Sequence, residues 1–562
     1  MSSKLFRKKT VEQIMAASRV SDKDAMPKIL GVRDLISFGI AAIVGAGIFS
    51  TIGLAAYNGG PAISMLFVFV AFACVFTALS YAQFASTVPV SGSAYTYAYV
   101  AFGELFAWII GWALILEYAV SNMVVAIAWS QYFVSMLAGF GITIPGWLTM
   151  APSYATEAFE KFQTQGIEAM SQVEQTALLA YQQAPKLGGM PILFDLPAGL
   201  ITFFVTWLVY IGIKESRNAS NIMVIIKVGV ILFVIIGGAF FVRPENWTPF
   251  APNGLTGVMG GVAAVFFAFI GFDSISTTAE ECKNPQRDLP RAMILTLLIC
   301  AVLYVLITLV LTGMVNYTEL NVKDPLSYVF SYIGMDFMAG IVSVTSVVAI
   351  TSALLVFQLA QPRIWMTMSR DGLLWKRFSK VHPKYKTPSF ATIVTGLVVA
   401  FPALFLKMDF FVDLTSVGTF FAFILVCGGV LYMDYSGISK QSKFKVPYVN
   451  GKYLIGLSFI AGLYVMFNYA PDALADWEDH SLMYILEHKI LDIFFWLTWL
   501  ILSIMAFKYN FSLLPVAGIL VNLYLMSELG ASNWFIFLIW LVMGLVVYFA
   551  YGYRKSKLNQ ES

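Results

Sequence analysis

Fourteen long apolar stretches recur along this chain of 562 residues, and they restrict its fold more than any other feature. A helix needs about 20 apolar residues to cross the hydrocarbon core of a bilayer, where its backbone polar groups must bond internally. The chain is 59% hydrophobic and only 12% charged, with a mean hydropathy of +0.77, which no soluble domain requires. We therefore predict an all-α membrane protein with fourteen spans, near residues 34–57, 61–88, 101–137, 196–213, 218–242, 257–280, 289–315, 337–366, 388–406, 409–434, 453–470, 491–507, 511–527 and 533–552.

The basic residues are distributed unevenly over the expected loops. If the N-terminus lies inside, the outer loops hold six of the 35 lysines and arginines, one more is buried in a span, and the other 28 lie on the inner side. An excess of basic residues in inner loops sets the orientation of membrane proteins. We therefore expect a multi-pass protein of the cell membrane, surrounded by lipid, with both termini in the cytoplasm and without a signal peptide. The net charge of +3 then reflects topology and not nucleic-acid binding.

Lys227 is a single basic residue about midway along the apolar stretch 218–242. At about 1.5 Å per residue, it lies roughly 15 Å beyond residue 218, near the bilayer midplane. A charge held there costs a few kcal/mol at least, so such groups usually line an ion or substrate pathway. Snorkelling to an interface is the alternative, but half a bilayer is a long way for a lysine side chain. We therefore favour a functional role.

Two spans contain glycines at positions where the helix is expected to open. The first reads Gly45-Ala46-Gly47 at mid-span, and the sixth carries Gly271 beside Asp273. An opened backbone presents free N–H groups to a carboxylate at the start of the second half-helix, and free carbonyls to an ammonium at the end of the first. Close helix packing through small residues explains many membrane glycines equally well. Interruptions in corresponding spans of two five-helix halves, however, indicate a transporter site at the midplane.

Several motifs resemble one family. The segment 266–293, FFAFIGFDSISTTAEECKNPQRDLPRAM, resembles the sixth span and following loop of the cationic amino acid transporter branch of the amino acid–polyamine–organocation superfamily. Similar motifs are GAGIF at 45–49, ILEYAVSN at 115–122, QPRIWMTMSRDGLL at 361–374 and VHPKYKTP at 381–388.

The resemblance implies a leucine-transporter-type fold, with two inverted five-helix repeats, broken helices one and six, and four further helices. The expected divisions are a cytoplasmic segment 1–33, a core 34–435, spans eleven to fourteen in 436–552 and a tail 553–562. The core contains an outer insertion at 146–195, which could be a lid, a partner surface, an interfacial helix or an inert insertion.

The resemblance also implies a substrate site made of backbone groups. The carboxylate of an α-amino acid would meet N–H groups around Gly45, Ala46, Gly47 and Ile48. Its ammonium would bond the carbonyls of Ile43, Phe267 and Ile270, with Ala268 inside the second break. Phe267 also resembles an aromatic gate over the occupied site.

Lys227 resembles a lysine that replaces the sodium ion of sodium-coupled relatives. Its amine would bond first-helix carbonyls near Ile43 and a hydroxyl of Thr351 or Ser352, and loss of its proton would loosen helix five from helix one. Glu117 and Asp273 are further buried acids, either proton-relay stations or partners for a cationic substrate side chain. The alternative is that both are structural acids with satisfied hydrogen bonds.

These observations predict a secondary active transporter of L-amino acids, working by proton symport and alternating access without sodium. No nucleotide-binding loop, catalytic constellation, metal-ligand spacing or cofactor motif is present, so an enzyme is not expected. An amino acid exchanger and a transport-deficient amino acid sensor remain alternatives. The preferred side chain, whether neutral, broad or cationic, stays open.

Overall fold

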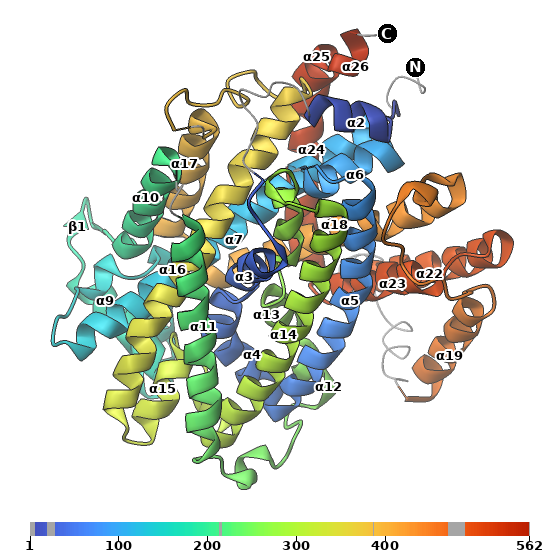
Figure 1. The fold of residues 1–562 in the computed structure, drawn as a ribbon. Helices are drawn as coiled ribbons and strands as arrows, with labels where there is room; N and C mark the ends of the chain where they lie inside the picture. Colours follow the sequence, from blue (N-terminus) through green and yellow to red (C-terminus); the bar gives the residue numbers. More distant parts are fainter. Residues whose placement is uncertain are drawn as a thin grey trace.

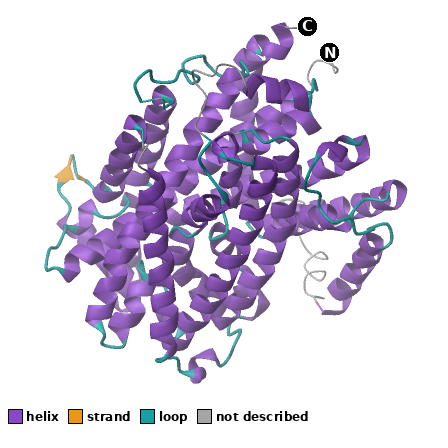
Figure 2. Ribbon diagram, in the orientation of Figure 1, coloured by secondary structure: helices purple, strands orange, loops and turns teal. Residues whose placement is uncertain are grey.

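The computed structural model is almost entirely helical (Figures 1 and 2). It describes residues 6–18, 28–90, 92–212, 216–385, 387–469 and 489–560. Parts of the expected segments 1–33, 436–552 and 553–562 lie outside these residues.

The elements fall into four groups along the chain. The first group is α2 (Val11–Ser18), α3 (Val32–Ile43), η1 (Gly47–Thr51), α4 (Ile52–Gly59), η2 (Gly60–Ala62), α5 (Ile63–Thr87), α6 (Ser93–Ala101) and α7 (Glu104–Gly139). The outer insertion holds η3 (Gly146–Leu148), α8 (Pro152–Gln165), η4 (Ile167–Ala169), α9 (Gln172–Gln183), β1 (Lys186–Leu187) and β2 (Met190–Pro191). Next come α10 (Leu196–Ile211), α11 (Ser216–Ala239), η5 (Pro244–Trp247), α12 (Gly254–Met259), α13 (Val262–Phe267), η6 (Phe272–Glu281), α14 (Pro285–Met314), η7 (Tyr317–Glu319), α15 (Pro325–Tyr332), α16 (Asp336–Arg370), α17 (Ser389–Phe405), α18 (Met408–Ser436) and η8 (Ile438–Gln441). The last group is α19 (Leu454–Tyr469), α22 (Ile490–Tyr509), α23 (Leu513–Ser527), α24 (Ala531–Val547), η9 (Tyr548–Gly552), α25 (Tyr553–Lys555) and α26 (Lys557–Gln560).

Local sequence explains several helix ends. The Asp34 carboxylate accepts a hydrogen bond from the N–H of Gly31 and fixes the start of α3. Asp195 caps α10 by accepting from the N–H of Ala198. At the other end of α10, Gly212 takes a positive φ of 78°, which a glycine adopts without strain.

The centre of the bundle is built around α7 and α14. Of the long apolar helices in the described part of the chain, α7 is the most buried, and it packs against α16, α17 and α18. Its large side chains Trp108, Tyr118 and Tyr132 are fully buried. Helix α14 packs along α5 and α3. Helix α14 also packs against η6, so it contacts parts of both segments where interruptions are expected.

Nine helical segments among the described residues are long and apolar enough to cross a membrane, and four shorter apolar helices accompany them. A multi-pass all-α membrane protein is therefore confirmed as the fold class. One of the nine segments, Gly47–Thr87, joins stretches that we predict as two spans. The number fourteen and the five-plus-five repeat stay predictions.

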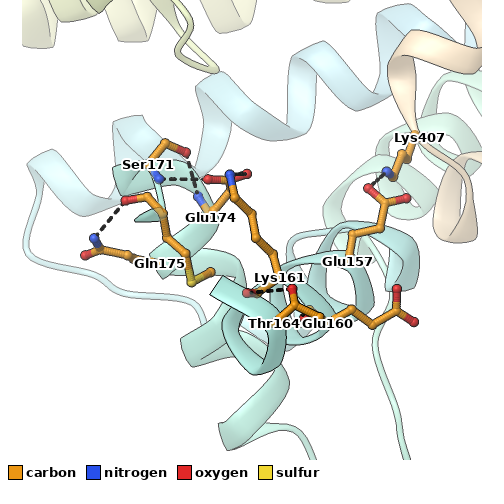
Figure 3. A network of polar contacts seen from close by, with 9 residues as sticks. Glu157, Glu160, Lys161, Thr164, Ser171, Glu174, Gln175 and Lys407 are labelled. Atoms are coloured by element: carbon orange, nitrogen blue, oxygen red, sulfur yellow. Dashed lines mark hydrogen bonds and ion pairs between the residues drawn. The ribbon is translucent and has the colours of Figure 1, made fainter. Parts of the chain in front are cut away.

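The outer insertion is a small folded unit on the molecule's edge. Its two helices, α8 and α9, enclose their own apolar cluster, which includes Met150, Ala158 and Leu178. A capping box at Ser171 and Glu174 starts α9, and Lys161 forms an ion pair with Glu174 at 2.8 Å (Figure 3).

Candidate functional site

The first expected interruption is present between α3 and η1. Helix α3 ends at Ile43, Val44 leaves the helical region with ψ of 84°, and the N–H of Gly45 turns back to the carbonyl of Ile43 at 2.8 Å. A π-helical turn then starts at Gly47. Within the described chain, no acceptor is in hydrogen-bond reach of the next three backbone N–H groups, those of Ala46, Gly47 and Ile48.

The second interruption lies between α13 and η6. Helix α13 ends at Phe267, and Gly271 takes a φ of 118°, which disfavours any residue with a side chain. The N–H of Ile270 bonds the carbonyl of Phe267 at 3.2 Å, so this carbonyl is already partly used. No donor among the described residues reaches the carbonyl of Ile270. Ala268 lies in the turn between the two half-helices.

The two interruptions press directly on each other. A methyl group placed on Gly47 would lie only 2.3 Å from the Cα of Ala268. A methyl group on Gly271 would lie 3.0 Å from the carbonyl carbon of Ala42. Backbone therefore meets backbone where the substrate carboxylate and ammonium are expected. The expected amino acid would fit here only after these half-helices separate.

Lys227 is completely buried on α11, and its amine donates to the carbonyl of Ala41 at 2.9 Å. This carbonyl lies in the last turn of α3, where carbonyls lose their helical partners because the helix stops at Ile43. A cation is favourable at a helix C-terminus. No described acidic residue pairs with this amine. The predicted contact with a first-helix carbonyl near Ile43 is therefore present.

The other partners predicted for Lys227 make different bonds. The Thr351 hydroxyl accepts from the Trp129 indole at 2.8 Å and donates to the carbonyl of Val347 in its own helix at 2.7 Å. The Ser352 hydroxyl donates to the carbonyl of Ala349 at 2.8 Å. Each hydroxyl donates within its own helix, and the amine of Lys227 bonds the carbonyl of Ala41 and not either hydroxyl, so the structure does not bring them to the amine.

Tyr304 is a site residue that the sequence did not reveal. Its hydroxyl, on α14, donates to the carbonyl of Ile43 at 3.0 Å, and its ring packs on Phe67 and Phe269. The carbonyl of Ile43 is therefore already bonded by Tyr304 and Gly45. A buried tyrosine in an otherwise apolar span is the one signal that could have indicated this contact, because its hydroxyl needs a partner.

A buried acidic cluster lies beside the second interruption. Tyr118, on α7, donates to Asp273 at 2.8 Å. Neither carboxylate oxygen of Glu117 has a described partner with acceptable geometry, although the hydroxyl of Thr419 is nearby. Within the cluster, the Tyr81 hydroxyl also has no described partner. Glu117 and Asp273 are each 1% exposed, and they are close enough to interact electrostatically. The structure therefore brings both predicted acids together in the interior.

The site is closed at both ends. On the side of the termini, the chain before α3 is held by backbone bonds of 3.0 Å from Leu30 to Glu281 and from Lys283 to Leu30. Arg363 of α16 adds an ion pair with Glu281 at 2.6 Å. On the opposite side, the Tyr132 hydroxyl donates to the carbonyl of Phe49 at 2.6 Å.

An all-α membrane bundle with two interrupted helices in contact at its centre has the architecture of a transport protein and not of an enzyme. Among the described residues, no group of acidic, histidine or cysteine side chains could hold a metal ion. The chain belongs to the amino acid permease family, whose model matches residues 30–495, and a model for the C-terminus of such permeases matches residues 512–556. The resemblance to the amino acid–polyamine–organocation superfamily and its cationic amino acid transporter branch is thereby confirmed.

The similar proteins differ in the substrates that their names state. The branched-chain amino acid permease of Bacillus subtilis is 37% identical over 561 residues, with both chains covered completely. The methylthioribose transporter of the same organism is 35% identical, covering 99% of this chain and 100% of its own. A vacuolar cationic amino acid transporter of Arabidopsis thaliana is 31% identical, covering 97% of this chain and 92% of its own.

Proposed function

We propose that this protein is a secondary active transporter that moves L-amino acids across the cell membrane by proton symport, through alternating access and without sodium. Both termini then face the cytoplasm. The observation that carries this proposal is the set of three free N–H groups, those of Ala46, Gly47 and Ile48. Buried backbone donors without partners are rare, so they indicate a missing ligand.

The ligand that fits these groups is a zwitterion. The free donors start a half-helix, whose dipole attracts a carboxylate. The free carbonyl of Ile270 and the partly used carbonyl of Phe267 lie across the contact between Gly47 and Ala268, and they can accept from an ammonium. Because all these contacts are made by the backbone, they recognise the α-amino acid group without reading its side chain. Phe267, which is 5% exposed and ends the half-helix α13, is the residue that we propose as the aromatic gate.

Lys227 supports sodium independence. When protonated, its amine places a covalently attached positive group at the C-terminal end of α3, where a free cation would otherwise neutralise the helix end. If the amine loses its proton, it can still donate a hydrogen bond to the Ala41 carbonyl, but the charge that strengthens this bond is lost. That change weakens the contact between α11 and α3, which is the link we propose between proton movement and opening.

Glu117 and Asp273 support a proton path on the other side of the interruption. A charged carboxylate without hydrogen-bond donors is expensive inside a protein. Glu117 therefore needs either a proton or a bound group, and Asp273, bonded by Tyr118, stands beside it.

Purified protein in proteoliposomes tests the proposal. Labelled amino acid should accumulate when the outside is acidic, with equal sodium on both sides, and a proton ionophore should abolish accumulation. Lys227→Met should lose accumulation, whereas Lys380→Met, at an exposed loop position, should keep it. Uptake that requires sodium contradicts the role of Lys227. Uptake that requires internal amino acid shows an exchanger, and binding without uptake shows a sensor.

The substrate itself needs a separate test, because one relative is named for methylthioribose, which is not a zwitterion. Unlabelled L-amino acids should compete with labelled substrate. Methyl esters and N-acetyl derivatives of the same amino acids should not compete, since each lacks one of the two charges that the backbone groups recognise. Competition by both derivatives would contradict the zwitterion site.

A further inference from the structure

The β-hairpin of the outer insertion holds two apolar side chains away from the molecule. Gly188 and Gly189 join its strands and both have positive φ, which suits a tight two-residue turn. The register pairs Leu187 directly with Met190, so both side chains lie on one face of the hairpin. They are 75% and 77% exposed. Figure 1 shows β1 at the edge of the molecule beside α10.

The two ends of the insertion differ in charge. Segment 184–194, which contains the hairpin, carries a single charged residue, Lys186. Helices α8 and α9 instead carry Glu157, Glu160, Lys161 and Glu174, which are among the residues of the polar network drawn in Figure 3. Such a division between an apolar and a charged side is typical of segments that lie at a membrane surface.

The neighbouring helices are short for a bilayer. Helix α10 has 16 residues and α17 has 17, so each is about 25 Å long, against a hydrocarbon core of about 30 Å. A groove of about 230 Å³ between their ends is lined only by glycine and apolar side chains, and it reaches beyond α10 to Phe194. Ile192, 38% exposed, continues this apolar surface toward the hairpin. The hydrophobic thickness missing from α10 is therefore supplied by the chain that precedes it.

We propose that the hairpin inserts Leu187 and Met190 into the lipid leaflet opposite the termini and anchors the outer insertion to the membrane. Lys186, next to Leu187, has a stem long enough to reach the phosphate level while its neighbours stay in lipid. The acyl chains of that leaflet are the partner. The anchor holds α8 over the outer end of α17, where Lys407 forms an ion pair with Glu157 (Figure 3). This inference needs only that the chain is embedded in a membrane, and it is independent of the transported substrate.

Spin labels on single introduced cysteines test the anchor in proteoliposomes. The four native cysteines are buried, so unmodified protein serves as the blank for labelling. Labels at Leu187→Cys and Met190→Cys should be more accessible to oxygen, which dissolves in lipid, than to a water-soluble nickel complex. A label at Gln165→Cys, exposed at the end of α8, should show the reverse order and is the matched control.

Two results would overturn the proposal. Equal nickel access at positions 190 and 165 would mean that the hairpin lies in water. Protection that disappears when the protein is diluted with lipid would mean that a second copy covers it. If labelled variants fail to fold, the unmodified protein can be irradiated with a lipid carrying a diazirine in its acyl chain. Lipid adducts are expected at residues 187–190, and their absence there, with adducts at the exposed face of α10, would also refute the anchor.

Discussion

Gly47→Ala should be far more damaging than Gly45→Ala, although the two glycines are only two residues apart. The added methyl at Gly47 would lie 2.3, 2.7 and 2.9 Å from atoms of Ala268, two of them backbone atoms. Ordinary contact needs roughly 3.5 to 4.0 Å, so the half-helices must move apart by more than about 1 Å. Overpacking of this kind costs about 1–3 kcal/mol, and a backbone obstacle places the substitution at the upper end of that range.

At Gly45 the nearest atoms are the methyl carbon of Ala353 at 3.2 Å and a methyl carbon of Val125 at 3.7 Å. These are side chains, which can yield by a few tenths of an ångström. We therefore expect Gly45→Ala to keep most of its thermal stability and uptake, and Gly47→Ala to lose both.

The assays are the unfolding midpoint of purified protein and initial uptake rates in proteoliposomes, normalised to reconstituted protein. The two variants should also differ in their affinity for the amino acid, because a methyl group at Gly47 occupies space where the carboxylate is expected. If the two variants unfold at the same temperature, the packing of Gly47 on Ala268 is not what holds the interruptions together. If Gly47→Ala transports normally, the proposed carboxylate site is wrong.

Three further predictions concern groups around the site. Tyr304→Phe removes one of two bonds to the carbonyl of Ile43, so it should lower stability by only about 0.5–1.5 kcal/mol. It should alter transport more strongly than Tyr328→Phe, a change at a partly buried tyrosine on α15. Burial raises the pKa of Asp195, a capping residue outside the spans, to about 6 from 3.8. The folded protein therefore binds this proton more tightly than the unfolded chain, and the stability that proton binding contributes falls as pH rises from about 4 to about 6. Asp195→Asn keeps the cap, so it should flatten the dependence of the unfolding midpoint on pH over that range. Lys9→Met breaks an ion pair of 2.5 Å with Asp371 on the side of the termini; unfolding should become easier by about 1.5–3 kcal/mol, and an unchanged midpoint would show that this contact is unimportant.

The membrane fold and the positions of the two interruptions could be predicted from the sequence because both depend on local composition. Apolar length determines which segments can span, and glycines at 45, 47 and 271 weaken the helix wherever they occur. The stop at Ile43 and the positive φ of Gly271 follow from this local chemistry. The contact of Lys227 with the first helix is expected from the family resemblance. The observed partner, Ala41, lies within two residues of Ile43, where a helix that stops leaves its last carbonyls free.

The remaining contacts depend on side-chain direction across helices far apart in sequence. Thr351 was a reasonable partner for the amine by its place in the chain, but its hydroxyl faces the indole of Trp129. Tyr304 lies 261 positions from the carbonyl that it bonds. No single-sequence pattern reports such pairing, because an apolar span with one tyrosine has the same composition whichever face it presents.

The closed arrangement of the site has an energetic consequence for transport. Three buried N–H groups without acceptors each cost about 1–3 kcal/mol, so the closed state without substrate must be held by contacts elsewhere. The bonds at its two ends, around Glu281 and at Tyr132, are of the kind required. A carboxylate bonded to those donors would remove much of that cost, but it needs the space now filled by Ala268. In the cycle that we propose, substrate and direct helix contact compete for one place, so an amino acid would stabilise a closed state only after one end has opened to admit it. If that order of events holds, the end contacts, and not the interruptions themselves, decide which side opens.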